Sequence, residues 1–172
     1  REENVDDRGV LNVILATMNR VVAAYRKEII VSTHPRTRKR MERMGGVKAD
    51  ARIRFLKPFG FSDYIKLQQN ALCVISDSGT ISEEAAIVGF PAITMRRSME
   101  RPEAMDAGSI VLTGMDTTTV MDSIEAVVRE RKEARQRHVP DEYCVRNTSW
   151  RVLKIILGTA KLSHEWSGIR VF

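Results

Sequence analysis

The fold of this chain follows from one stretch, Cys73-Val-Ile-Ser-Asp-Ser-Gly-Thr-Ile-Ser-Glu-Glu-Ala-Ala-Ile-Val-Gly-Phe-Pro-Ala-Ile-Thr94. It opens with a short apolar run typical of a buried strand, turns at Ser78-Gly79 and continues as a short helix with two early carboxylates. Another apolar run follows Pro91 and predicts a second strand. Strand, turn, helix and strand in this order are typical of a parallel sheet covered by helices.

The turn between the first strand and the helix predicts an anion site. The first N–H groups of a helix have no acceptor within the helix, and the potential there is positive, which suits a phosphate. The predicted anion-binding turn, called the lip below, consists of Ser78, Gly79 and Thr80. Glycine lets a ligand approach the backbone closely, and the two hydroxyls add hydrogen-bond donors. Glu84 lies further in, where its carboxylate would lean back and accept hydrogen bonds from a ribose diol. An ordinary turn with a capping serine is the alternative.

Length and composition bound the class of protein. The chain has 172 residues, of which 43% are apolar and 29% charged, and we expect residues 1–172 to form a single domain. No apolar run approaches the roughly 18 residues of a membrane span, and we expect no signal peptide. The two cysteines, Cys73 and Cys144, are too few and too far apart for a metal site. We therefore expect a cytoplasmic protein with no metal and no membrane partner.

The net charge of +6 comes largely from two basic stretches, residues 36–43 and 129–137. Aromatic residues make up only 6% of the chain and do not interleave with these stretches. A solvated helix face explains the basic stretches better than nucleic-acid binding does, and the charge equally suits a small anionic ligand. We expect no nucleic-acid partner.

The remaining sequence alternates amphipathic stretches with short apolar runs. The apolar spacing predicts helices over 6–27, 37–44, 62–70, 80–88, 117–137 and from 148 onwards. Ser62 is the predicted N-cap of the third of these helices. The apolar runs predict about five parallel strands, over 29–31, 53–56, 72–76, 91–95 and 110–112.

Ligands of parallel sheets bind beyond the carboxyl ends of the strands, so the loops at those ends are candidate sites. His34 follows a strand and could contact an anionic ligand or cap the next helix. Phe59 or Tyr64 could stack on a base, with core packing as the alternative. Arg101 could grip a diphosphate through its planar guanidinium, although an ion pair with a neighbouring glutamate explains it as well.

Several of these residues resemble, in order, motifs of the C-terminal half of non-hydrolysing UDP-N-acetylglucosamine 2-epimerases. The matching segments are Arg1-Glu-Glu-Asn4, His34-Pro35, Ser76-Asp-Ser-Gly-Thr-Ile-Ser-Glu-Glu-Ala85, Gly89-Phe-Pro91 and Glu100-Arg-Pro-Glu103. The resemblance covers nearly the whole chain and weakens after Val139. Residues 55–96 look closest to the capsule and O-antigen branch of the family.

The resemblance implies a fold and a ligand. The fold would be an α/β, Rossmann-like parallel sheet with helices on both faces, one half of a glycosyltransferase-B-like protein whose N-terminal domain and first strand lie outside this chain. The ligands would be UDP and a UDP-N-acetylhexosamine, and the full-length protein would be a homodimer. The family uses no metal and no cofactor.

The resemblance also implies a role for each matching residue. Ser78, Gly79 and Thr80 would bind the diphosphate, Glu84 the ribose, and Arg101 the phosphates of the leaving group. Tyr64 would lie beside uracil, and Phe59 would line the same site. His34 matches a histidine of a regulatory UDP-sugar site in some members.

The implied reaction is an elimination followed by an addition, in which UDP leaves C1 as the C2 proton is removed and returns after C2 is protonated on the other face. It would convert UDP-N-acetylglucosamine to UDP-N-acetylmannosamine, or a UDP-N-acetyl-L-talosamine-type sugar to UDP-N-acetyl-L-fucosamine, for cell-surface polysaccharide precursors. The catalytic histidine and acids would lie outside this chain, so we expect the chain alone to be inactive. The alternatives are half of a nucleotide-sugar glycosyltransferase and a non-catalytic nucleotide-binding module.

Overall fold

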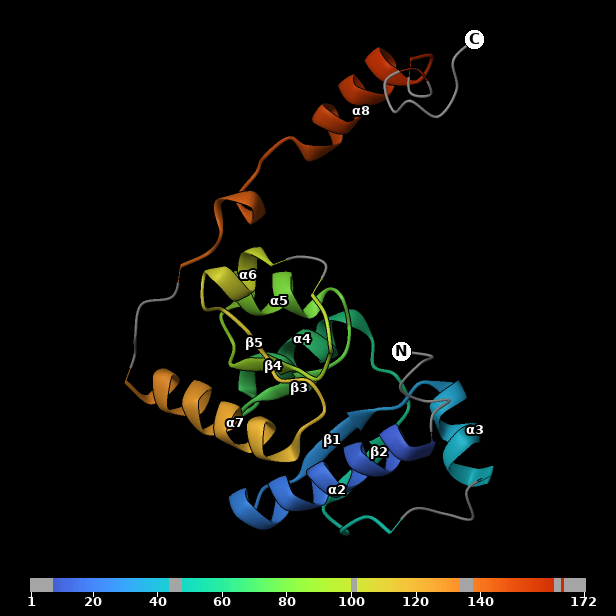
Figure 1. Ribbon diagram of the computed structural model, residues 1–172, viewed down its shortest axis with the longest axis vertical. Coiled ribbons are helices and arrows are strands. Elements are labelled where there is room, and N and C mark those ends of the chain that lie inside the picture. The colour runs from blue at the N-terminus through green and yellow to red at the C-terminus, as the bar shows by residue number, and fades with distance from the viewer. Residues whose placement is uncertain (1–7, 44–47, 100–101, 134–137, 163–164, 166–172) are drawn as a thin grey trace. The chain divides into compact units, whose positions relative to one another are not determined.

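The computed structural model describes residues 8–43, 48–99, 102–133, 138–162 and 165 (Figure 1). The chain divides into two compact units, Arg1–Pro140 and Asp141–Phe172. The extent of the domain predicted over residues 1–172 stays a prediction. None of the described helices has the length and apolar character needed to cross a bilayer.

The first unit alternates helices with short strands. Its elements are α2 (Arg8–Tyr25), β1 (Ile29–Ser32), α3 (Pro35–Arg43), β2 (Ile53–Leu56), α4 (Phe61–Asn70), β3 (Val74–Ser76), α5 (Ile81–Val88), β4 (Ala92–Thr94), α6 (Glu103–Asp106), β5 (Val111–Leu112) and α7 (Thr117–Lys132). The five strands of the described residues match the predicted runs.

Every strand pairing is parallel, but the strands form two sets. β1 pairs with β2, and β3, β4 and β5 form a three-stranded set in that order. The parallel pairing agrees with the predicted fold class, and the described strands form two sets where the sequence did not predict a division. Doubly wound sheets have the strand order 3-2-1-4-5-6. The two sets fit this order when β1 and β2 are its strands 2 and 3, and β3, β4 and β5 are its strands 4, 5 and 6.

The core lies on β4, the middle strand of the second set. Ala92, Ile93 and Thr94 are all buried, as expected for a central strand that is covered on both faces. A cluster of buried apolar side chains joins β4 to α7: Ile93, Met95, Val120, Ile124, Val127 and Val128. Figure 1 shows α7 on one side of this set and α5 on the other, and both helices contact β4.

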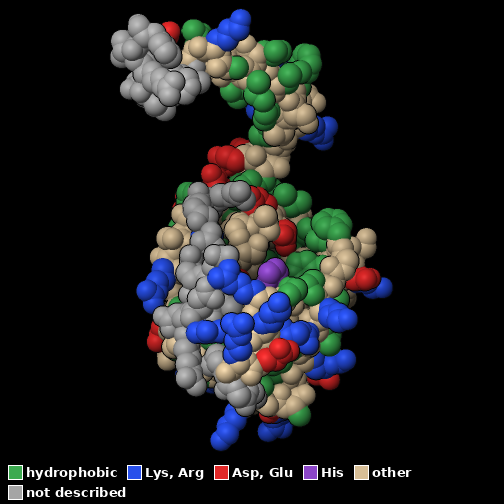
Figure 2. Space-filling model, turned by 90° about the vertical axis from the view of Figure 1, so that its right-hand side faces the viewer, with side chains coloured by type: hydrophobic (Ala, Val, Ile, Leu, Met, Phe, Trp, Pro, Cys, Tyr) green, Lys and Arg blue, Asp and Glu red, His purple; other side chains and the backbone are tan. Residues whose placement is uncertain are grey.

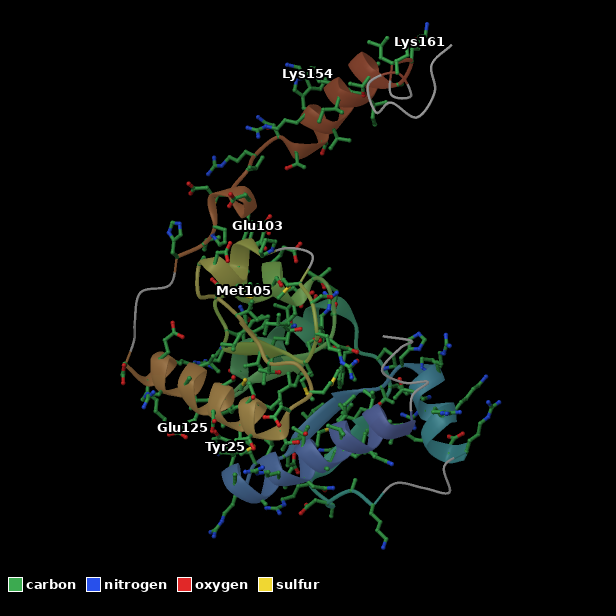
Figure 3. All side chains as sticks on the ribbon, viewed as in Figure 1. Tyr25, Glu103, Met105, Glu125, Lys154 and Lys161 are labelled. Carbon is green, nitrogen blue, oxygen red and sulfur yellow. The ribbon has the colours of Figure 1, made fainter. Side chains whose placement is uncertain are left out.

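The long helix α2 packs against α7 through its predicted apolar face. Ile14, Val21 and Tyr25 pack against the cluster that contains the buried side chains of α7. Leu11, Leu15 and Val22 are buried along the same helix at the expected helical spacing. At its end Tyr25 lies near Glu125 of α7 (Figure 3). Burial, and then the negative charge of Glu125, raise the pKa of Tyr25. The two helices thus join elements from opposite ends of the first unit.

The start of α4 differs from the prediction. Gly60, in an extended conformation, is the N-cap, and no side chain caps the helix. Ser62 is exposed inside the first turn, so the prediction that Ser62 is the N-cap is wrong. The helix begins at Phe61 because Gly60 is the last residue with an extended backbone.

The second unit contains a 3-10 turn, Asp141–Tyr143, and the helix α8 (Thr148–Thr159). Asn147 begins this helix with a positive φ of 62°. The helix has no buried residue, and its large apolar side chains are exposed: Trp150, Val152, Leu153, Ile155, Ile156 and Leu157.

Candidate functional site

The predicted lip lies between β3 and α5, in the residues that follow Ser76. The Ser76 hydroxyl accepts a hydrogen bond from the amide of Ser78 at 3.1 Å, and the Ser78 hydroxyl accepts one from the amide of Thr80 at 3.3 Å. Thr80 is the N-cap of α5, and its side chain makes no capping bond. The serine is therefore not the N-cap residue, although its hydroxyl accepts from the amide of the residue that is. The hydroxyls instead fix the shape of the turn itself.

Glu84 turns back toward this lip. The hydroxyl of Thr80 donates a 2.6 Å hydrogen bond to Oε1 of Glu84, and the hydroxyls of Ser78 and Thr80 lie 3.0 Å apart. The Glu84 carboxylate is half-buried, whereas Ser78 and Thr80 are exposed. Three of the predicted residues thus form one chain of hydrogen bonds that leads from the outer edge of the turn to a carboxylate.

The helix α4 supplies the other side of the cluster. The side-chain amide of Gln68 donates a 2.7 Å hydrogen bond to Oε2 of Glu84. Burial, and then the negative charge of Glu84, raise the pKa of Tyr64, while a side-chain hydrogen bond with Gln68 lowers it. Asp77 also raises this pKa through its charge. Tyr64 is therefore an uncharged phenol at neutral pH, close to Glu84 and Asp77.

Gln68 is a site residue that the sequence analysis missed. Its side chain is only 3% exposed, although glutamine is normally found at protein surfaces. It lies four positions after Tyr64, so both residues occupy one face of α4. This spacing was a usable signal, because it places an amide beside the aromatic ring that was already a candidate.

The structure does not test the predicted roles of two further residues, Phe59 and Arg101. Phe59 is half-buried in the loop between β2 and α4, and its contact with a base stays a prediction. Arg101 lies outside the described residues, so its predicted grip on the phosphates also stays a prediction. Gly79 lies in the turn between Ser78 and Thr80, as expected.

His34 occupies the end of β1 and the start of α3. Its ring Nδ1 accepts a hydrogen bond from the amide of Arg36 at 3.3 Å, and its carbonyl accepts one from the amide of Arg38 at 3.1 Å. These are the bonds of an N-cap, which was one of the two alternatives for this histidine. A role in a regulatory site stays a prediction.

The helix α3 is strongly basic and has no buried residue. Figure 2 shows Lys and Arg side chains gathered on one face of the first unit. Within α3 the basic residues are Arg36, Arg38, Lys39, Arg40 and Arg43. This arrangement matches the predicted solvated basic face.

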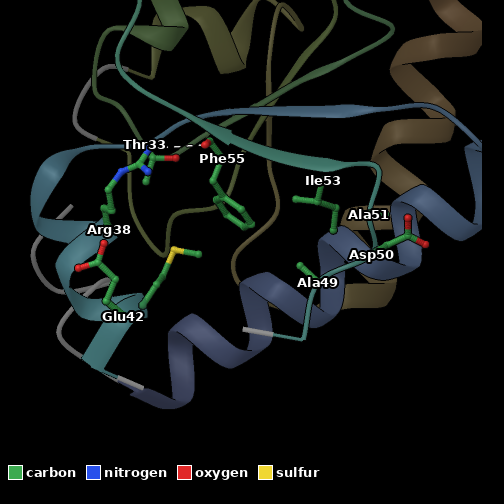
Figure 4. A pocket seen from close by; sticks show the side chains of 9 residues that line it. Thr33, Arg38, Glu42, Ala49, Asp50, Ala51, Ile53 and Phe55 are labelled. Atoms are coloured by element: carbon green, nitrogen blue, oxygen red, sulfur yellow. Dashed lines mark hydrogen bonds between the residues drawn. The ribbon is translucent and has the colours of Figure 1, made fainter. Parts of the chain in front are cut away.

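A hollow of about 400 Å³ lies elsewhere in the first unit, between α3, β2 and residues 49–51 (Figure 4). Arg38, which lines it, donates a long hydrogen bond of 3.5 Å to the carbonyl of Phe55. Asp50 is paired with Arg52 at 2.8 Å, and this hydrogen bond lowers the pKa of Asp50. Charged groups of opposite sign line the hollow, so it does not form a site for one anion.

A family model described as UDP-N-acetylglucosamine 2-epimerase matches residues 1–157. The UDP-N-acetylglucosamine 2-epimerase of Methanococcus maripaludis is 30% identical over 164 residues, which are 94% of this chain and 43% of that protein.

Solved structures are similar over the same region. The UDP-GlcNAc 2-epimerase of Methanocaldococcus jannaschii, in complex with UDP-GlcNAc and UDP, has a TM-score of 0.80 at 29% identity, over 91% of this chain and 43% of its own. The UDP-N-acetylglucosamine 2-epimerase from Rickettsia bellii has a TM-score of 0.77 at 35% identity, over 95% of this chain and 45% of its own. The likeness confirms the predicted α/β class, a Rossmann-like half of a glycosyltransferase-B-like fold, and this chain spans less than half the length of these relatives.

Proposed function

Because this chain belongs to the UDP-N-acetylglucosamine 2-epimerase family, we propose that it is the nucleotide-binding half of a UDP-N-acetylhexosamine 2-epimerase. The observation that carries the proposal is the hydrogen-bonded chain from Ser78 through Thr80 to Glu84 at the start of α5. It brings hydroxyl donors, a helix N-terminus and a carboxylate to one edge of the sheet. Those groups suit the diphosphate and the ribose of a nucleotide.

Each part of UDP finds a chemically matched group in this cluster. The diphosphate would lie at the start of α5, at the positive end of the helix and beside Ser78, Gly79 and Thr80. The Ser78 hydroxyl can rotate to donate to it, while the Thr80 hydroxyl keeps its bond to Glu84. The two ribose hydroxyls would donate hydrogen bonds to Glu84. The uracil would lie on the α4 side, beside the ring of Tyr64, with Phe59 in the loop that precedes α4. Arg101 is proposed to bind the phosphates from the segment before α6.

The reaction places a specific demand on this half of the enzyme. In the elimination, a base removes the C2 proton, the C1–O bond breaks, and UDP departs with the bonding electrons, leaving a 2-acetamidoglycal. In the return step, C2 is protonated on its other face and UDP adds to C1. The developing negative charge on the diphosphate is what a helix N-terminus and an arginine stabilise. The proton transfers would be carried out by groups outside this chain.

The substrate is proposed as a class. Its nucleotide part is UDP and its sugar is a 2-acetamido hexose, either N-acetylglucosamine or an N-acetyl-L-talosamine-type sugar. The contacts proposed in this chain all go to the nucleotide, so they favour neither sugar. We further propose that the protein acts in the cytoplasm, as a homodimer, in the synthesis of precursors of capsule or O-antigen polysaccharides.

One experiment tests reaction type and substrate together. The full-length protein that contains this chain is incubated with UDP-N-acetylglucosamine in deuterated water, and the C2 position is followed by NMR and mass spectrometry. A 2-epimerase incorporates deuterium at C2, because the proton is lost to a group that exchanges with solvent. Release of UDP without label at C2 would instead indicate a glycosyltransferase or a hydrolase, and no turnover with tight UDP binding would indicate a binding module.

A further inference from the structure

Gln68 is a buried amide whose position in the cluster gives it a specific task. It is only 3% exposed, and its Nε2 donates to Oε2 of Glu84 from a different helix, sixteen residues away in the sequence. The other oxygen of the same carboxylate, Oε1, receives the hydroxyl of Thr80. Glu84 is therefore held from two sides, by α4 and by the turn before α5.

These two hydrogen bonds fix the direction of the Glu84 carboxylate and leave a defined number of its acceptor positions open. A glutamate side chain has several rotatable bonds, and two donors on different elements remove that freedom before any ligand arrives. A carboxylate has about four acceptor positions, two on each oxygen. With one position on each oxygen used by Gln68 and Thr80, one remains on each. Two adjacent hydroxyl donors, such as a ribose 2′,3′-diol, match this remainder.

We infer that Gln68 is a positioning residue, which orients Glu84 so that both of its oxygens meet a ribose diol and thereby makes the site select ribonucleotides over 2′-deoxyribonucleotides. The inference rests on the proposed function, because it requires Glu84 to contact the ribose. Gln68 itself does not touch the nucleotide. Its contribution lies in the second hydroxyl contact, which a 2′-deoxy ligand cannot make.

The test compares two ligands in the full-length protein. The dissociation constants of UDP and 2′-deoxy-UDP are measured by calorimetry, and their ratio is the readout. The wild type should prefer UDP by about tenfold, because a hydrogen bond to a charged group is lost with the 2′ hydroxyl. Gln68→Met keeps the size of the side chain and removes the donor, so the ratio should fall by at least about threefold. Gln69→Met, an exposed neighbour, is the matched control and should keep the ratio.

A second variant covers the case in which Gln68→Met does not fold. Gln68→Glu keeps the shape but places a carboxylate against Glu84, and two carboxylates at this distance share one proton at low pH and repel each other when both are ionised. The preference for UDP should therefore be weak at high pH and return as the pH falls, while the wild type measured alongside changes little.

The possible results separate the two claims. If the wild type binds UDP and 2′-deoxy-UDP equally, the proposed contact between Glu84 and the ribose is ruled out, and the proposed function of Glu84 with it. A wild type that prefers UDP, together with a Gln68→Met variant that loses affinity for both ligands equally, would leave the proposed function standing and overturn the positioning role. A pH-independent ratio in Gln68→Glu would overturn it as well.

Discussion

Arg131 and Ala71 join the end of α7 to the end of α4, because the Arg131 guanidinium donates a 2.7 Å hydrogen bond to the carbonyl of Ala71 and a 3.1 Å bond to that of Gln69. The last carbonyls of a helix have no partner within the helix, and a cation there also opposes the negative end of the dipole. This contact anchors the C-terminal end of α4, the helix that carries Tyr64 and Gln68.

Replacing this arginine should therefore loosen α4. Arg131→Met should lower the free energy of unfolding by about 1 kcal/mol, because two charge-assisted hydrogen bonds are lost at an exposed site. Arg131→Lys should recover only part of the loss, since an ammonium cannot hold the same forked geometry. Urea denaturation measures both variants, with Arg129→Met on the same helix as the control. Equal stability of Arg131→Met and Arg129→Met would show that the contact contributes nothing.

Loss of the Glu84 carboxylate should weaken nucleotide binding without unfolding the protein. Glu84→Ala should raise the dissociation constant of UDP about tenfold or more, because hydrogen bonds from the ribose to a charged acceptor disappear. Glu84→Gln should be intermediate, since it keeps one good acceptor. Calorimetry with UDP gives the affinities, and thermal unfolding checks the fold. Wild-type affinity in Glu84→Ala would discard the site.

Asp116 gives the first unit a pH-dependent element. Its carboxylate accepts bonds from the amide of Thr119 at 2.7 Å and from the Thr119 hydroxyl at 2.8 Å, which caps α7. The backbone bond, and then the hydroxyl bond, lower the pKa of Asp116 from its usual 3.8. A lowered pKa means that the stabilisation is complete above pH 3.8 and disappears as the pH falls through the lowered value.

The expected outcome for Asp116→Ala is a lower melting temperature at pH 7 and a difference from the wild type that shrinks under acid conditions. Asp116→Asn keeps an acceptor that does not titrate, so its difference from the wild type should be smaller at pH 7. Thermal unfolding followed by circular dichroism between pH 2 and pH 7 measures all three proteins (about five points suffice for the trend). A difference that stays constant over this range would contradict the capping role.

The features that sequence predicted well are those determined by local pattern. Helix and strand positions follow from apolar spacing, and the approach of Glu84 to Thr80 follows from their separation by one helical turn. Contacts between elements were not predictable in the same way. The bond from Gln68 to Glu84 and that from Arg131 to Ala71 depend on how two helices pack, and apolar spacing gives the buried face of a helix but not the residues opposite it.

The error at Ser62 and the unpredicted division of the strands also have physical reasons. Ser62 has the chemistry of an N-cap, but Gly60 reaches the required extended backbone two residues earlier, so the serine falls inside the helix. The division of the strands into two sets is a property of sheet order. Each strand is recognised by its own apolar run, and that run does not say which strand lies beside it.

The bond between Thr17 and Thr117 is the longest-range hydroxyl contact among the described hydrogen bonds, with a sequence separation of 100. Thr17 lies on α2 and is 1% exposed, whereas Thr117 opens α7 and is half-buried. The hydroxyls lie 2.9 Å apart. A buried hydroxyl without a partner is costly, so a variant that removes only one of the two hydroxyls leaves the other unpaired. The loss of stability on removing both should therefore be smaller than the sum of the two single losses.

Valine in place of threonine keeps the shape and removes the hydroxyl, so the pair suits a double-mutant cycle. Thr117→Val should lower the free energy of unfolding by about 1–2 kcal/mol, since it strands the buried hydroxyl of Thr17, and Thr17→Val should cost less because Thr117 can turn to water. The double variant should be more stable than the sum of the single losses predicts, with a coupling of about 1 kcal/mol. Strict additivity in urea denaturation would mean that α2 and α7 are held by apolar packing alone, with the hydroxyl pair adding nothing.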